Sequence, residues 1–185
     1  MKITDDVIEE GANRPPTKTH ISQIVSGGQT GVDRAALDAA VEANISIGGW
    51  CPRGRRSEDG RIPDGYPLKE TAARSYAIRT EWNVRDSDGT LIIVQDEISS
   101  GTRLTVSSAR KQNQPYLVVH LRPDADALFE DQPCLDNQIK QVLNWLVENE
   151  IKVLNVAGPR GSSNASVYSE AREFLSLLFQ KVDRE

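Results

Sequence analysis

The sequence has few side chains that bind metals or form disulfides. It contains two cysteines, Cys51 and Cys134, and two histidines, His20 and His120. The cysteines share no short metal-ligand spacing and are too few for the disulfide framework of a small secreted protein. Both histidines are isolated in the sequence, so we expect structural roles for them. These absences predict a protein with no intrinsic metal, with reduced thiols and with a cytoplasmic location.

Long apolar runs and an excess of positive charge are also lacking. No run approaches the roughly 20 apolar residues of a membrane span. The first residues, 1–6, lack the basic start and apolar centre of a signal peptide. The chain has 22 Lys and Arg against 27 Asp and Glu, a net charge of -5. Nucleic-acid-binding proteins usually carry a basic face. We therefore expect no membrane and no nucleic acid among its partners.

Apolar runs alternate with helical patterns along the 185 residues. Residues 1–19 form a polar lead-in, and residues 20–185 are predicted to form one domain. Strands are predicted over 21–25, 45–50, 91–94, 116–121 and 153–157. Helices are predicted over 35–41, 68–85, 102–113, 135–147 and 168–178. This alternation predicts an α/β, Rossmann-like doubly wound fold, with a mostly parallel sheet and helices on both faces.

Such a fold binds ligands beyond the carboxyl ends of its strands, near a topological switch point. The loops that leave strands at this edge are 26–31, 51–66, 95–102 and 158–164. The second loop is rich in arginine, with Arg53, Arg55, Arg56 and Arg61. Arginine binds phosphate with two parallel hydrogen bonds, so we expect this loop to bind an anion. The alternative is a solvated basic loop that is balanced by its own acids.

The glycine-rich turn Ser26–Asp33 follows the first predicted strand and leads into a helix. Backbone amides of Gly27, Gly28 and Gly31, with the hydroxyl of Thr30, are expected to hold a phosphate. The turn matches neither standard nucleotide fingerprint and contains no lysine, which argues against an ATPase. The alternative is a tight turn whose glycines serve only packing. Asp33 either accepts hydrogen bonds from a ribose or pterin, or caps the helix.

Two further turns lead directly into predicted helices. Hydroxyls of the Ser99–Thr102 segment are suited to cap a helix, to hold a phosphate, or both. The Gly158–Asn164 segment is a second glycine-rich turn. Asn164 or Ser163 is suited to cap the helix that follows, and the alternative is a ligand-binding turn in which Arg160 reaches the ligand. Cys51 is expected to be a small buried residue at a strand end.

Four separated blocks of the chain resemble the family named "putative molybdenum carrier". They are Ser26–Asp33, Gly48–Pro52, Arg79–Asp88 and Gly158–Arg160, within a match over about residues 21–178. This family is similar to a Rossmann-like group that includes molybdenum cofactor carriers and the cytokinin-activating phosphoribohydrolases, long labelled lysine decarboxylases. The resemblance implies a small phosphorylated ligand, either the molybdenum cofactor (molybdopterin) or a nucleotide. It also implies a homo-oligomer, a dimer or larger.

The chain departs from the hydrolases at their catalytic motif. Arg79 falls at the position of the motif's arginine, and Gly101-Thr102 matches its Gly-Thr pair. Thr105, however, stands where the hydrolases have glutamate. Glycosidic hydrolysis needs a carboxylate, which threonine cannot supply.

We therefore predict a non-catalytic binder of a phosphorylated, nucleotide-like ligand. One alternative is a nucleoside-monophosphate N-glycosidase in which Glu81 or Asp33 supplies the carboxylate, and another is a nucleotide-sensing regulatory module. The predicted ligand-binding residues are Gly27, Gly28, Gln29, Thr30, Gly31, Asp33, Arg53, Arg79, Ser100, Gly101 and Thr102.

Overall fold

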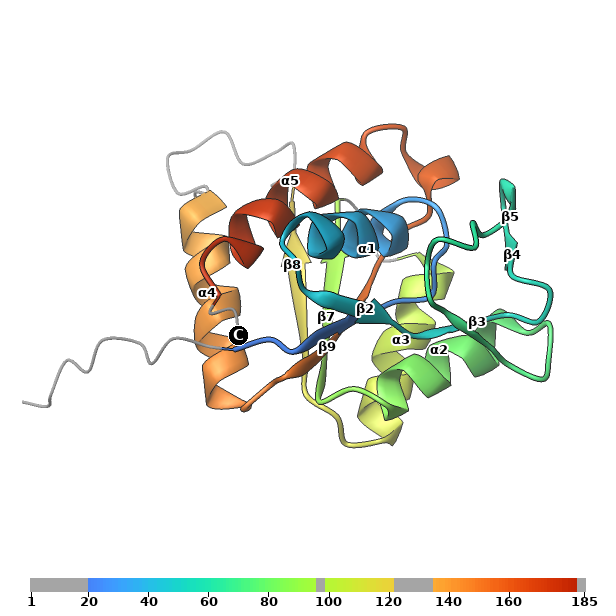
Figure 1. The fold of residues 1–185 in the computed structure, drawn as a ribbon. Helices are drawn as coiled ribbons and strands as arrows, with labels where there is room; N and C mark the ends of the chain where they lie inside the picture. The colour runs from blue at the N-terminus through green and yellow to red at the C-terminus, as the bar shows by residue number, and fades with distance from the viewer. Residues whose placement is uncertain (1–19, 96–98, 122–134, 183–185) are drawn as a thin grey trace, which may run out of the picture.

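Five parallel strands form the centre of the computed structural model, which describes residues 20–95, 99–121 and 135–182 (Figure 1). They are β1 (Gln23–Val25), β2 (Ser46–Gly48), β7 (Gly89–Val94), β8 (Tyr116–His120) and β9 (Val153–Ala157). Their order in the sheet is β2-β1-β9-β7-β8, and every neighbouring pair is parallel. The predicted doubly wound, Rossmann-like fold is confirmed. The predicted lead-in, residues 1–19, lies outside the described residues.

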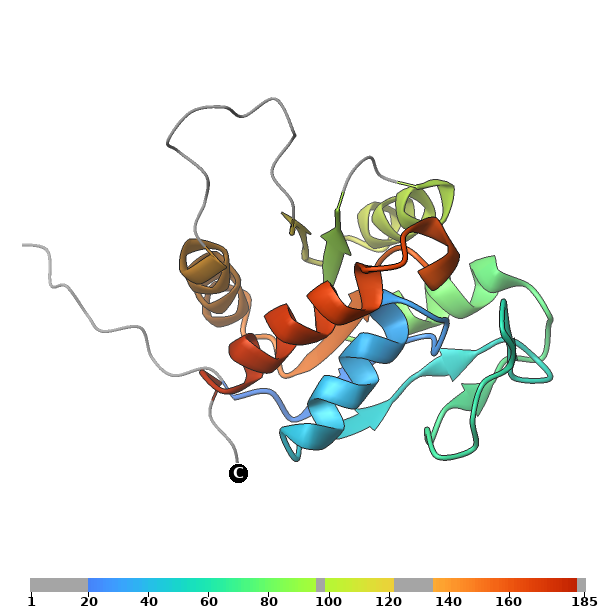
Figure 2. The same ribbon diagram turned by 90° about the horizontal axis from the view of Figure 1, so that it is seen from above.

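Helices cover both faces of the sheet (Figures 1 and 2). They are α1 (Val32–Glu42), α2 (Tyr76–Arg85), α3 (Ser100–Lys111), α4 (Leu135–Glu148) and α5 (Val167–Phe179). The helices α1, α4 and α5 pack on one face, and α2 packs with α3 on the other. The adjacent strands β9 and β7 therefore lead into helices on opposite faces, which opens a crevice at their carboxyl ends.

The main apolar core lies between the sheet and the helices α1, α4 and α5. All six residues of β7 are buried, as expected for a parallel strand covered on both faces. The buried face of α1 carries alanines, which let α5 approach closely; Phe174 and Leu178 fill the space between α5 and the sheet. The C-terminal helix thus fixes the position of α1 and of the turn that precedes it.

A second, smaller core cluster lies under loop 51–66. It is formed by Leu37, Cys51, Ile62 and Leu68. Cys51 is fully buried there, which confirms the structural interpretation of this residue. Cys134 lies outside the described residues. The loop also contains a short antiparallel pair, β4 (Arg56–Ser57) with β5 (Gly60–Arg61).

The predicted helix over residues 68–85 is wrong in its first half, because α2 begins only at Tyr76. Instead, the short strand β6 (Lys69–Glu70) pairs in parallel with β3 (Trp50–Cys51). The Thr71 amide continues this pairing with the Cys51 carbonyl at 2.9 Å. The predicted helix is too long because local spacing cannot reveal a pairing with residues about 20 positions earlier in the chain. The consequence is that Tyr76 stands at the start of α2, at the carboxyl edge of the sheet.

None of the helices in the described part of the chain is both long and apolar enough to cross a membrane. Within the same residues, no three His, Cys, Asp or Glu side chains gather as a metal-binding group.

Candidate functional site

A pocket of about 190 Å³ opens at the carboxyl edge of the sheet, where β9 and β7 diverge into α5 and α3. The position is the one that the doubly wound topology predicts for a ligand. Loops after β1, β7 and β9 and the first turns of α2 and α3 supply its walls. The lining residues are Gln29, Asp33, Tyr76, Arg79, Thr80, Ser99, Ser100, Gly101, Leu104, Thr105, Ala157, Gly158, Arg160 and Ser163.

One wall of the pocket is the N-terminal end of α3. Ser99 caps this helix, and its side-chain oxygen accepts a hydrogen bond from the Thr102 amide at 3.2 Å. The amides of Ser100 and Gly101, which line the pocket, have no partner within the described residues. Free amides at a helix start, together with the helix dipole, favour a negatively charged group.

A buried ion pair lies beside that helix start. Arg79 of α2 donates from Nη1 to Asp33 Oδ2 at 3.0 Å, and both side chains are largely buried. Burial raises the pKa of Asp33, although Arg79 and the Gln29 amide act to lower it. Within the described part of the chain, the buried Nε of Arg79 has no hydrogen-bond partner. Because this Nε is buried, Arg79 can offer it to a ligand only when its side chain turns toward the pocket.

The glycines of the Ser26–Asp33 turn make room for groups of the protein itself. A Cβ on Gly27 would lie 1.8 Å from Arg79 Nη1. Gly31 has a φ of +78°, and a Cβ there would lie 2.5 Å from the Pro159 carbonyl oxygen. Packing is thus sufficient to explain these glycines, and a phosphate-binding role for their amides stays a prediction.

The anion beside this turn is the carboxylate of Glu58, from loop 51–66. It accepts hydrogen bonds from the Ser162 amide at 2.9 Å, from the Ser162 hydroxyl at 2.6 Å, and from the Thr30 hydroxyl. The Gly161 amide donates to Thr30 Oγ1 at 3.0 Å. Burial acts to raise the pKa of Glu58, but the hydrogen bonds from Ser162 and Thr30 lower it overall. The Glu58 carboxylate thereby connects the Ser26–Asp33 turn with the Gly158–Asn164 turn.

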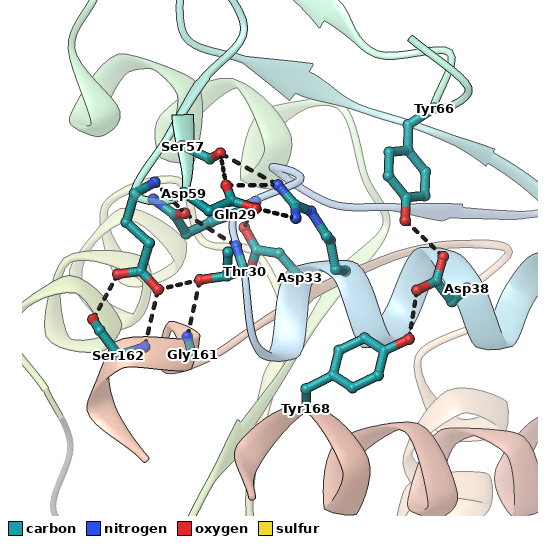
Figure 3. Close-up of polar contacts among 12 residues, drawn as sticks. Gln29, Thr30, Asp33, Asp38, Ser57, Asp59, Tyr66, Gly161, Ser162 and Tyr168 are labelled. Carbon is teal, nitrogen blue, oxygen red and sulfur yellow. Dashed lines mark hydrogen bonds and ion pairs between the residues drawn. The ribbon is translucent and has the colours of Figure 1, made fainter. Parts of the chain in front are cut away.

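Two more contacts fix the same loop on α1 (Figure 3). Asp38 accepts hydrogen bonds from the hydroxyls of Tyr66 and Tyr168, each at 2.7 Å. Arg34 donates to both carboxylate oxygens of Asp59, at 2.6 and 3.0 Å. The hydrogen bond from Arg34 lowers the pKa of Asp59 to about 2. These contacts hold loop 51–66 against α1, beside the pocket, and no residue of this loop lines the pocket.

The arginines of loop 51–66 have separate surroundings. Arg55 is buried and donates to the carbonyls of Ile62, Pro63, Tyr66 and Leu68, so it holds the loop together and is not available for an anion. Arg61 pairs with Asp64 at 2.8 Å. Arg53 is exposed and does not line the pocket, whereas Arg56 lies over the ring of Tyr76.

The model of the circularly permutated YpsA SLOG family matches residues 24–179, which include every residue that lines the pocket. The chain belongs to the circularly permutated YpsA SLOG family. A solved structure from Syntrophus aciditrophicus SB, named "Putative molybdenum carrier protein", is 40% identical to this SLOG family chain. The match covers 88% of this chain and 97% of the Syntrophus chain, with a TM-score of 0.80. The resemblance to molybdenum carriers is therefore confirmed. A search of curated proteins gives no match.

The pocket of this SLOG family chain gathers part of the predicted site. The predicted residues that line it are Gln29, Asp33, Arg79, Ser100 and Gly101, together with Arg160. The predicted residues outside its lining are Gly27, Gly28, Thr30, Gly31, Arg53 and Thr102. The hydroxyls of Thr30 and Thr102 already make contacts inside the protein, Thr30 with Glu58 and Thr102 with Ser99.

Tyr76 and Leu104 are among the pocket residues that the sequence does not indicate, because the apolar spacing places both inside predicted helices. The signal for Tyr76 was the serine before it, since Ser75 is the N-cap of α2 and such a residue often marks a helix start. The sequence also does not indicate that Glu58 binds the glycine turn.

Proposed function

We propose that the pocket at the start of α3 binds a small phosphorylated ligand, and that the protein carries this ligand without turning it over. The proposal rests on one observation: backbone amides and an arginine side chain with unpartnered N–H groups lie at the same pocket. The amides of Ser100 and Gly101 and the buried Nε of Arg79 have no partners in the described residues. A phosphate accepts several such bonds at once.

The family relationship supports a particular kind of ligand. The relative from Syntrophus aciditrophicus is named as a molybdenum carrier protein. The cofactor that carries molybdenum, molybdopterin, is a pterin with a phosphate, and it resembles a nucleotide in joining a planar ring to a phosphate. We propose a ligand of this class, the molybdenum cofactor or a nucleotide.

A change of Ser100 tests the helix-start contribution. Ser100→Pro removes the amide at the first helical position, where proline fits the helix, and Ser99 already has the extended conformation that precedes proline. Ser100→Ala keeps the amide and serves as the matched control. We expect at least a ten-fold weaker affinity for GMP in Ser100→Pro than in Ser100→Ala, measured by calorimetric titration. Equal affinities in the two variants would contradict the proposal.

A nucleoside-monophosphate hydrolase is the second candidate, and one observation favours it. Asp33 is buried in the pocket wall, and burial raises its pKa, as in many carboxyls that act as general acids. Glu81 is exposed and does not line the pocket. Release of free base from GMP or AMP, abolished by Asp33→Asn and kept by Glu81→Gln, would establish the hydrolase. The carrier proposal predicts no release above background.

A further inference from the structure

One pocket residue presents an aromatic ring to solvent. Tyr76, the first residue of α2, has an exposed fraction of 37%. The other large apolar side chains exposed in the described residues are Val41 and Leu135, and neither lines the pocket. Because Tyr76 is both exposed and part of the pocket lining, its ring is available to a ligand.

A guanidinium group faces the same ring from the loop after β3. Arg56 of β4 places its Cζ atom 6.0 Å from the centroid of the Tyr76 ring. This is the distance of a cation–π contact, and Arg56 itself lies beside the pocket and does not line it. A planar ring between them needs about 7 Å, which is two van der Waals contacts of about 3.5 Å. Arg56 is exposed, so its side chain can move outward and give room for a flat ring.

The ring end and the anion end belong to one pocket. The helices α2 and α3 pack together and both begin at the carboxyl edge of the sheet (Figure 2). Tyr76 thus lines the same pocket as Ser100 and Gly101, and Leu104 adds apolar surface to it. A ligand with its phosphate at the start of α3 can direct an attached ring toward Tyr76.

We propose that Tyr76 and Arg56 hold a planar heterocycle between them and make the pocket specific for heterocyclic phosphates over sugar phosphates. The inference rests on the proposed function, because it assumes a phosphate at the start of α3. Base stacking on an aromatic side chain tolerates many ring types, since every base has a π-face. The pair therefore selects the class of ligand, a nucleotide or a pterin phosphate, by its ring.

The test compares GMP, which carries a ring, with ribose 5-phosphate, which does not. Calorimetric titration is done on the wild type, on Tyr76→Ala and on Tyr76→Phe. We expect the wild type to bind GMP about ten to a hundred times more tightly than ribose 5-phosphate. Tyr76→Ala should remove most of this difference without changing the affinity for ribose 5-phosphate, and Tyr76→Phe should keep it.

Tyr116→Ala is the matched control, because Tyr116 also lies under an arginine, Arg110, at 5.7 Å but does not line the pocket. This variant should bind GMP as the wild type does. Unchanged GMP affinity in Tyr76→Ala, or an equal loss for both ligands, would overturn the inference while leaving the proposed function intact. Failure of the wild type to bind either ligand would overturn both proposals.

Discussion

Replacing Gly27 with alanine tests whether the glycine turn is shaped by Arg79. The added Cβ would lie 1.8 Å from Nη1 and 2.3 Å from Cζ of Arg79, so the guanidinium group has to move. Its ion pair with the buried Asp33 would then be lost. Loss of one partner from a buried pair costs about 3–5 kcal/mol. Because burial raises the pKa of Asp33, this carboxyl can take up a proton, and we expect about 3 kcal/mol, the low end of that range.

Urea unfolding measures this loss, with Gly65→Ala as the control. A Cβ at Gly65 meets no atom within 4 Å, so the control should stay within about 0.5 kcal/mol of the wild type. The same Gly27→Ala change is then made in an Arg79→Ala background, where the clashing group is gone. There it should cost less than about 1 kcal/mol, because neighbouring sites are not additive. An equal cost of Gly27→Ala in both backgrounds would refute the reasoning.

Three further perturbations test the contacts that hold the loops beside the pocket. Glu58→Gln removes the charge that accepts two hydrogen bonds from Ser162, and should lower the free energy of unfolding by about 1–2 kcal/mol in urea titrations. The Arg34 guanidinium holds the pKa of Asp59 at about 2, below the unfolded value of 3.8. Its contribution is present above pH 4 and is lost as the pH falls toward 2, so the stability difference between wild type and Asp59→Asn should shrink over that interval. Gly31→Ala, at a φ of +78° with a carbonyl oxygen 2.5 Å from the added Cβ, should lower the free energy of unfolding by at least about 2 kcal/mol, and a loss below 0.5 kcal/mol would contradict the close approach of the two turns.

The layered fold could be predicted because its signals are local. Apolar runs of the length of a strand alternate with helical spacing, and β7 shows the continuous burial of a parallel strand. The alternation fixes a parallel sheet, and the topology then places the ligand pocket at the carboxyl edge. Arg79, Ser100 and Gly101 were predicted as site residues by this reasoning and by the family resemblance, and the pocket brings them together.

The rest of the site depends on contacts between distant parts of the chain. Thr30 and Ser162 meet the same carboxylate, although Glu58 lies 28 residues from one and 104 from the other. No local pattern encodes such a contact. The start of α2 at Tyr76 could not be predicted for the same reason. Local spacing indicates a helix from residue 68, whereas Lys69–Glu70 pair with an earlier strand.

A crystal structure of the protein with GMP is the most direct test of the proposed site. The account predicts the phosphate within hydrogen-bond distance of the amides of Ser100 and Gly101, with Arg79 turned partly from Asp33 toward it. A phosphate bound in the Ser26–Asp33 turn in place of Glu58, or anywhere outside the pocket, would contradict it.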